Sequence, residues 1–286
     1  MSGFLGETYN KRMTEHEIGL MLTENRAFVE RIAWYSVGIV NQLAEIDHTQ
    51  RTAGDVLGTG TACRWKDYRI ILTADHVVAE AKPSDLAFLL RVDDALQWER
   101  TGKDEEVISR VTLPVKDIVH CKEKDLAAII LNTKELSDSK MQFLELPKSL
   151  AKNRTSKSEG SLVLLGYPVD QKELYTQVKK SEAIANYFYL RPIILAGTLA
   201  ETPTKPLDRR YDPNRDVLVN YTPADPNMKP HGFSGAAAWS DRKERSGTLW
   251  TADPMLFGVQ TAAFMTSKLL LVVGAPAVRE FLEESL

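Results

Sequence analysis

Short apolar runs rich in Val, Ile, Leu and Tyr constrain the fold of this chain most, because each run has the length of a strand and polar or Gly/Pro residues separate them. Ten runs predict strands, at residues 33–40, 68–72, 86–92, 107–113, 126–131, 162–167, 193–199, 217–221, 256–264 and 269–273. Because no helices regularly alternate with them, an antiparallel barrel or sandwich is favoured over a doubly wound parallel sheet. The sequence therefore predicts an all-β fold.

Two segments have the pattern of helices. Residues 15–31 place apolar side chains at near-helical spacing among charges and predict an amphipathic N-terminal helix. The sequence PAVREFLEES follows Ala275, with Pro276 suited to a first helical turn, and predicts a C-terminal helix.

A polar stretch, 137–160, divides the predicted strands about equally and suggests two halves. We expect four parts, listed here in chain order: an N-terminal helical extension over 1–32, a first β-barrel over 33–140, a linker over 141–160, and a second β-barrel with the terminal helix over 161–286. Two charged stretches, 201–216 and 240–254, are expected to be long loops.

The charge balance excludes some partners. The chain has 36 basic and 39 acidic residues, a formal charge of -3, and no long block of one sign, so neither nucleic acid nor a membrane surface is an expected partner. The longest apolar run, 269–278, is too short for the roughly 20 residues that cross a bilayer. The first twenty residues lack the apolar core of a secretory signal. We expect a soluble, cytoplasmic protein.

Two cysteines, Cys63 and Cys121, are the only ones in the chain. They have neither the CxxC spacing of zinc and redox sites nor the framework of small secreted proteins. We expect them to be unbridged thiols in a reducing compartment.

Three residues stand in contexts that suit chemistry. His76 ends an apolar strand in RIILTADHVV, which gives the firm support that a general base needs. Ser234 lies between Gly232 and Gly235, which permit unusual backbone angles and close approach by a substrate. Asp125 directly precedes an apolar strand that could draw its carboxylate inward to orient a histidine. Taken singly, each also has an ordinary structural interpretation: a surface histidine, a Gly/Ser turn, a solvated aspartate.

The order of the three residues along the chain separates the classes of serine hydrolase. No histidine follows Ser234, which excludes the order of the α/β-hydrolases. The order is His76, Asp125, Ser234, with spacings of 49 and 109 residues. This is the order of the chymotrypsin type, in which two barrels contribute to one site.

Three motifs carry a resemblance to a known family. TADHVV, EKDLAAIIL and GFSGAA resemble the histidine, aspartate and serine motifs of trypsin-like serine proteases of the chymotrypsin fold. GTGTA, LVLLGYP, FGVQTAAF and VVGAPAVREFLEE resemble the bacterial branch that includes the high-temperature-requirement proteases. The resemblance covers residues 33–284. It implies two six-stranded antiparallel β-barrels, with the N-terminal helix outside the similarity.

The resemblance also implies roles for the three residues. Ser234 would attack a peptide carbonyl, His76 would take and return its proton, and Asp125 would orient the imidazole and stabilise its cation. The backbone N–H groups of Gly232 and Ser234 would form the oxyanion hole. No metal or organic cofactor is expected.

The chain departs from the family pattern beside the serine. Phe233 stands where zymogens of the digestive type have an aspartate that pairs with a newly cut N-terminus, so that activation switch is absent. Ala236 and Ala237 replace the usual glycine and proline, which leaves the N–H donors intact.

By position in the family, a primary specificity pocket is expected to include five residues: Met228, His231, Thr261, Ala262 and Ala263. None of them is acidic. Because burying a cation without a partner is costly, we expect no preference for Lys or Arg.

Two functions of different classes remain open. The first is an intracellular serine endopeptidase acting on protein substrates, restrained by a partner protein or by the N-terminal helix, although that helix could simply pack on the barrel. The second is a catalytically silent protease-like module that binds a peptide or protein at the same site. The presence of all three residues favours catalysis.

Overall fold

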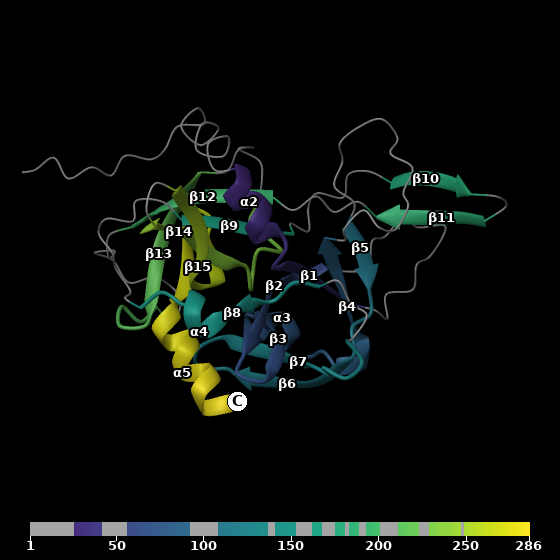
Figure 1. Ribbon diagram of the computed structural model, residues 1–286, viewed down its shortest axis with the longest axis horizontal. Helices are drawn as coiled ribbons and strands as arrows, with labels where there is room; N and C mark the ends of the chain where they lie inside the picture. The colour runs from purple at the N-terminus through teal and green to yellow at the C-terminus, as the bar shows by residue number, and fades with distance from the viewer. Residues whose placement is uncertain are drawn as a thin grey trace, which may run out of the picture.

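Strands dominate the chain and gather into two halves (Figure 1). The computed structural model describes residues 26–41, 56–91, 108–136, 141–152, 162–167, 175–180, 183–188, 193–200, 211–222, 229–246 and 249–286. Both halves are built almost entirely from antiparallel strand pairs. The predicted all-β fold is confirmed.

The first half is an eight-stranded sheet in the order β5-β4-β1-β2-β3-β7-β6, with β8 paired to β2. Its strands are β1 (Ser36–Asn41), β2 (Val56–Trp65), β3 (Tyr68–Thr73), β4 (Leu86–Arg91), β5 (Ile108–Val111), β6 (Val115–Cys121), β7 (Leu126–Leu131) and β8 (Leu144–Glu145). The short helix α3 (Asp75–Val78) follows β3, and the turn η1 (Pro83–Asp85) precedes β4. Strands β6 and β7 form a hairpin, and β7 pairs with β3. The C-terminal end of β3 and the turn of this hairpin therefore lie at the same end of the strands.

The second half is a closed six-stranded barrel in the order β12-β13-β16-β15-β14-β9. Its strands are β9 (Leu162–Gly166), β12 (Ile193–Leu199), β13 (Asp216–Thr222), β14 (Ala237–Ser246), β15 (Leu249–Phe264) and β16 (Leu269–Gly274). Closure leaves no free edge within the barrel. Among the described residues, strands β10 (Tyr175–Lys180) and β11 (Ala183–Phe188) pair only with each other.

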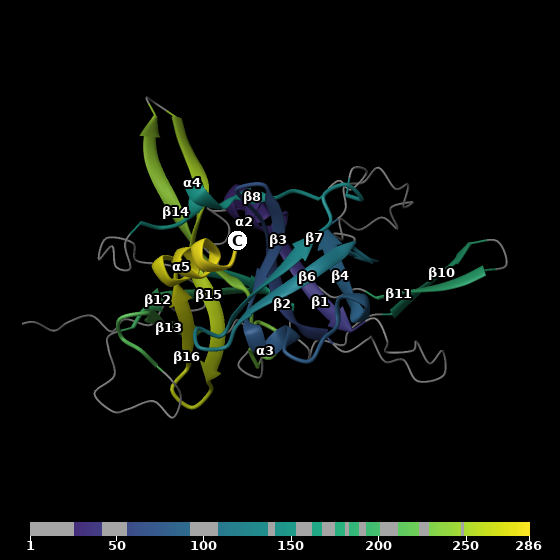
Figure 2. The same ribbon diagram turned by 90° about the horizontal axis from the view of Figure 1, so that it is seen from below.

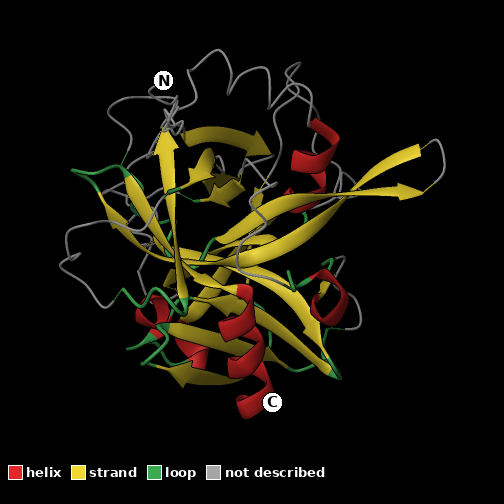
Figure 3. Cartoon of the chain, turned by 90° about the vertical axis from the view of Figure 1, so that its left-hand side faces the viewer, coloured by secondary structure: helices red, strands yellow, loops and turns green. Residues whose placement is uncertain are grey.

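The charged stretch 240–254 was expected to be a loop, and this prediction was wrong. Strands β14 and β15 continue through it as a two-stranded ribbon, paired from Ser240 with Met255 to Ser246 with Leu249. The ribbon projects from the barrel (Figures 2 and 3). Since β14 pairs with β9 only at Ala238 and Trp239, the ribbon beyond has no third strand beside it in the described residues. A two-stranded ribbon without a third strand beside it needs no apolar face. Its sequence therefore lacks the alternation of apolar and polar residues that is typical of a half-buried strand.

Helix α2 (Arg26–Ala33) confirms the last part of the predicted N-terminal helix, whose residues 15–25 lie outside the described residues. The predicted strand at 33–40 starts later, at Ser36, because the helix extends to Ala33. Six strands were not predicted: β2, β6, β8, β10, β11 and β14. In β2 the Gly/Thr-rich sequence GTGT resembles a turn, and β6 places exposed polar residues between half-buried ones.

One hydrophobic core runs through both halves. Trp65 and Leu126 of the first sheet belong to the same buried cluster as Trp239 and Phe257 of the barrel, together with Phe28 of α2. Within the stretch expected to link the halves, helix α4 (Leu146–Ser149) buries Leu146, and β8 pairs with β2. The domain boundaries remain a prediction.

Both cysteines are free, Cys63 within the core and Cys121 half-buried. Burial raises the pKa of the Cys63 thiol well above its ordinary value. None of the helices that the structure describes is long and apolar enough to span a membrane.

Helix α5 (Ala275–Ser285) confirms the predicted C-terminal helix, with Pro276 in its first turn. Its buried residues recur every three or four positions and face the barrel: Ala275, Ala277, Val278, Phe281 and Leu282. This spacing is what an amphipathic helix needs to cover a sheet.

We predict that Phe281→Ala lowers the free energy of unfolding by about 3–5 kcal/mol, because the ring is 1% exposed and its removal leaves a cavity. Urea denaturation followed by circular dichroism measures this change. Glu283→Ala, an exposed position of the same helix, is the control and should change stability by less than about 0.5 kcal/mol. Equal effects of the two substitutions would show that α5 does not pack as described.

Candidate active site

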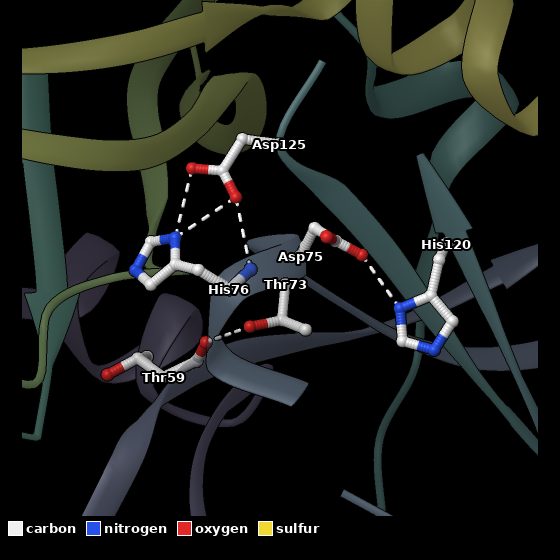
Figure 4. A network of polar contacts seen from close by, with 6 residues as sticks. All are labelled: Thr59, Thr73, Asp75, His76, His120 and Asp125. Carbon is white, nitrogen blue, oxygen red and sulfur yellow. Dashed lines mark hydrogen bonds and ion pairs between the residues drawn. The ribbon is translucent and has the colours of Figure 1, made fainter. Parts of the chain in front are cut away.

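His76 and Asp125 are in direct contact. His76 is the second residue of α3, which follows the buried end of β3, and Asp125 directly precedes β7. The imidazole Nδ1 lies 3.0 Å from Oδ1 and 2.9 Å from Oδ2 of the carboxylate (Figure 4). A carboxylate only accepts hydrogen bonds, so Nδ1 carries the proton and Nε2 presents its lone pair. This is the tautomer that a general base at Nε2 needs.

Asp125 also caps the helix that carries His76. Its backbone carbonyl accepts the N–H of Asp75 at 3.1 Å, and Oδ1 accepts the N–H of His76 at 3.1 Å. Two of the N–H groups that a helix start leaves without partners are therefore bound. Asp125 adopts a φ of 51°, in the left-handed region that aspartate enters more readily than most residues. One residue thus fixes both the imidazole and its helix.

The second half of the molecule holds the turn before Asp125. The Lys124 ammonium lies 3.1 Å from a Glu280 oxygen and 3.3 Å from a Glu284 oxygen on α5. Burial by itself would lower the pKa of Lys124, but the hydrogen bonds and charges of the two glutamates outweigh it and raise that pKa. Helix α5 is thereby attached to the turn.

A second contact reaches the same turn from the barrel. Arg215 donates from Nη1 to the carbonyl of Glu123 at 2.9 Å. Its other nitrogens bind both oxygens of Asp216, whose side chain is fully buried, at 2.7 and 2.9 Å. These hydrogen bonds raise the pKa of Arg215 despite its partial burial. A guanidinium held in this way is a rigid support.

Ser234 lies where two tight turns meet. The N–H of Phe233 donates to the Pro230 carbonyl at 3.2 Å, and the N–H of Ala236 donates to the Phe233 carbonyl at 2.7 Å. The third residues of these turns are Gly232, with a φ of 93°, and Gly235, with a φ of 87°, values that only glycine adopts without strain. The residues flanking Ser234 are buried, whereas Ser234 itself is half-buried.

Two backbone donors beside Ser234 are available. In the part of the chain that the structure describes, neither the N–H of Gly232 nor that of Ser234 has an acceptor. Phe233, between them, is fully buried, and its ring lies against Gly166, where any Cβ would overlap it. The turn is therefore anchored by aromatic packing.

Thr59 joins the serine turn to the first half. Its N–H donates to the Ser234 carbonyl at 2.8 Å, and its Oγ1 donates to the Gly232 carbonyl at 2.6 Å. The Thr59 carbonyl accepts from Thr73 Oγ1 at 2.7 Å, three residues before His76 (Figure 4). Thr59 therefore links the serine turn to the strand that leads to His76, although the Ser234 hydroxyl makes no hydrogen bond to His76 among the described residues.

The residues expected in the specificity pocket have different surroundings. Thr261 and Ala262 are buried, Ala263 is half-buried and His231 is exposed, whereas Met228 lies outside the described residues. Thr261 lies at a bulge of β15, between Gln260 and Ala262.

Gln260 was missed by the sequence analysis. Its carbonyl accepts from the Gly235 N–H at 2.7 Å, and its N–H donates to the Ala236 carbonyl at 2.8 Å, so it supports the serine turn from behind. Its side-chain oxygen is buried without a partner among the described residues. A glutamine inside an apolar strand was the available signal.

A second histidine–aspartate pair was also missed. Asp75 Oδ1 lies 2.7 Å from His120 Nδ1 (Figure 4). Adjacent titratable residues in TADH were the available signal, but only the fold brings His120 to Asp75. No group of three His, Cys, Asp or Glu residues in the described ranges could hold a metal ion.

We predict that Gly235→Ala lowers the free energy of unfolding by at least about 2 kcal/mol. Alanine is strained at this φ, and its Cβ would overlap the Thr59 carbonyl and Thr73 Oγ1. Thermal and urea denaturation measure the loss. Ser234→Ala, one residue earlier, removes only a hydroxyl and should stay within about 0.5 kcal/mol of wild type. A wild-type midpoint for Gly235→Ala would refute the described turn.

We predict that Glu280→Gln/Glu284→Gln lowers the free energy of unfolding by roughly 0.5–1 kcal/mol, a small effect because both carboxylates are more than half exposed. The raised pKa of Lys124 means that its charged form adds stability at lower pH and loses this contribution as pH rises through the folded-state value, above the ordinary 10.5. The difference in urea midpoint between variant and wild type should therefore be smaller at about pH 11 than at about pH 8. A difference of the same size at both pH values would contradict the role of Lys124.

Comparisons with known proteins give the fold. No known family profile and no curated protein matches the chain. Among solved structures, the chain is similar to the active form of the Rv3671c protease from M. tuberculosis, with 15% identity, a TM-score of 0.52, and coverage of 92% of this chain and 86% of that one. The MamO protease domain from Magnetospirillum magneticum in its apo form has 12% identity and a TM-score of 0.49, covering 87% and 96%.

A third solved structure, the serine endoprotease from Yersinia pestis, has 17% identity and a TM-score of 0.48, covering 90% of this chain. The chain spans 64% of that protein, less than two thirds of its length. The arrangement of strands and the likeness to the Rv3671c protease show that the chain has the fold of trypsin-like serine proteases.

Proposed function

We propose that the protein is a serine endopeptidase that hydrolyses peptide bonds of protein substrates with Ser234, His76 and Asp125. The observation that carries the proposal is the doubly hydrogen-bonded His76–Asp125 pair on the helix next to the Ser234 turn. A Cβ at Gly58 would overlap both the Ser234 carbonyl and the side chain of Val77, the residue after His76, which supports a short separation between turn and helix.

In the proposed reaction, Nε2 of His76 accepts the hydroxyl proton of Ser234 while Oγ attacks the substrate carbonyl. The tautomer set by Asp125 leaves Nε2 ready for this proton, and the carboxylate stabilises the imidazolium that forms. The same proton then passes to the leaving amine. Water repeats the sequence on the acyl-enzyme and releases the second product.

The backbone N–H groups of Gly232 and Ser234 would bind the oxyanion. Two donors without acceptors in the described residues support this role, because each such donor contributes on the order of 10²- to 10³-fold in rate in comparable sites. The buried Phe233 holds the donors in place without an ion pair. The site needs no cofactor for this chemistry.

The wider setting is part of the same proposal. The enzyme acts in the cytoplasm, where its two unbridged cysteines stay reduced. A protease there needs restraint, which we assign to a partner protein or to the N-terminal extension. Helix α2 buries Phe28 and Ile32 in the core, so the part of the extension that could regulate lies before it.

A silent binding module is the second candidate. The observation in its favour is that the Ser234 hydroxyl is not hydrogen-bonded to His76 among the described residues. Proteases without substrate often have such loose geometry, which tightens when substrate binds. The two candidates differ in whether Ser234 reacts.

We predict that a fluorophosphonate probe labels the purified full chain at Ser234. Ser234→Ala and His76→Ala should abolish labelling, because one removes the nucleophile and the other its base. Asp125→Asn should slow labelling at least about 100-fold, because the amide favours the wrong tautomer. Gel fluorescence and mass spectrometry of the labelled peptide measure these effects.

Glu145→Gln is the matched control, since it removes an exposed ion pair with Arg64 away from the site. It should label like wild type. A folded wild-type protein that stays unlabelled, with and without candidate partner proteins, would support the silent module instead. Labelling that survives His76→Ala would refute the assignment of the base.

We predict that cleavage shows no preference for Lys or Arg before the cut bond. None of the residues assigned to the pocket is acidic, and a buried cation without a carboxylate partner is costly. Mass spectrometry of a peptide library after digestion measures the preference, with Ser234→Ala as the blank. Cut sites dominated by Lys and Arg would overturn the assigned pocket.

A further inference from the structure

The Asp75–His120 pair connects the same two segments as the His76–Asp125 pair, and the proposed mechanism does not use it. We propose that Asp75 and His120 are positioning residues that hold His76 in register with Asp125. The inference rests on the proposed function, because it concerns the base of that reaction.

The two pairs are reciprocal (Figure 4). Helix α3 supplies Asp75 and His76, which are neighbours in sequence. The β6–β7 hairpin supplies His120 near the end of β6 and Asp125 just before β7. Each segment therefore gives one carboxylate and one imidazole. The second pair therefore adds a side-chain contact to the hydrogen bonds that Asp125 already makes with α3.

Burial distinguishes the aspartate of the second pair from that of the first. The Asp75 side chain is 8% exposed, whereas those of His76 and Asp125 are 46% and 36% exposed. A carboxylate that is buried to this extent needs a hydrogen-bond donor. Among the described residues, His120 is the only side-chain partner of the Asp75 carboxylate. The 2.7 Å contact is thus a requirement of the fold at this point.

The position of Asp75 explains how the pair acts on His76. Helix α3 has four residues, too few to be rigid alone. Asp125 holds it at the N–H groups of Asp75 and His76, and the Asp75 side chain holds it from the hairpin. Without that side contact, rotation of α3 would move Nε2 of His76 from the position that the proposed reaction needs. Misplacement by about 1 Å costs on the order of 10²-fold in rate.

The test compares two substitutions of one residue in the full chain. His120→Leu removes the donor, whereas His120→Asn keeps a side-chain N–H close to the place of Nδ1. With a fluorophosphonate probe, His120→Leu should lower the maximal labelling rate about 10- to 100-fold and leave the half-saturating concentration within about twofold. His120→Asn should label within about threefold of wild type. Labelling by His120→Leu at the wild-type rate would overturn the proposal.

A double variant separates positioning from stability. Asp75→Leu/His120→Leu replaces both partners with apolar side chains, an exchange that often leaves a protein stable. Its melting temperature should return toward that of wild type while its labelling rate stays low. A labelling rate restored together with the melting temperature would mean that the pair only stabilises the fold, and would overturn the proposal.

A second readout does not depend on reactivity. In the ¹⁵N-histidine-labelled protein, the downfield proton signal of the His76 Nδ1–H, identified by its loss in His76→Ala, reports the bond to Asp125. His120→Leu should shift or broaden this signal, whereas His120→Asn and the remote control Glu145→Gln should preserve it. A wild type that does not react with the fluorophosphonate probe would refute the proposed function. In that case the inference about His76 is overturned if His120→Leu leaves this signal unchanged.

Discussion

Thr59 makes the hydrogen bonds on which the geometry of the site depends. This residue of β2 is completely buried and binds Gly232, Ser234, Thr73 and the N–H of Tyr167. Its donors and acceptors bind three segments: the serine turn, the end of β3 and Tyr167 directly after β9. Since buried polar groups without partners are costly, these segments cannot separate without loss of stability. The serine turn is thereby fixed to the sheet that carries His76.

The turn before Asp125 connects the two halves in the opposite direction, because the second half holds it. It belongs to the first sheet, but Arg215 and helix α5 of the second half bind it through Glu123 and Lys124. The half that carries Ser234 therefore helps to place Asp125, and the half that carries His76 holds the serine turn. Because each half binds a part of the candidate site that belongs to the other half, we expect the two halves to resist sliding past each other. The shared core around Trp65 and Trp239 adds to this resistance.

The sequence indicated the strands of the core because burial demands apolar runs, as at Leu126–Leu131, where every residue is buried. It did not indicate the ribbon of β14 and β15, since a projecting pair of strands needs hydrogen bonds but no apolar face. The motifs around His76, Asp125 and Ser234 could be recognised because local residue types carry them.

The supports of these motifs could not be recognised from sequence. Arg215 and His120 act on partners 92 and 45 residues away, and only the folded chain brings them together. Thr59 belonged to a motif that was noted, but its role depends on a carbonyl 173 residues away. Short-range patterns therefore indicate the candidate catalytic residues, whereas long-range contacts determine how their side chains are held.

Phe233 has consequences for how such a site could be restrained. A turn that depends on an ion pair with a new N-terminus is assembled only after cleavage, but a turn anchored by a fully buried ring is assembled when the chain folds. The two N–H donors beside Ser234 are therefore in place from the start. Any restraint on the proposed reaction must act elsewhere, on access to the site or on the distance between Ser234 and His76. In the proposed arrangement α3 positions His76 and so affects its distance from Ser234, which is why the contacts of Asp75 matter in a site whose donors are assembled on folding.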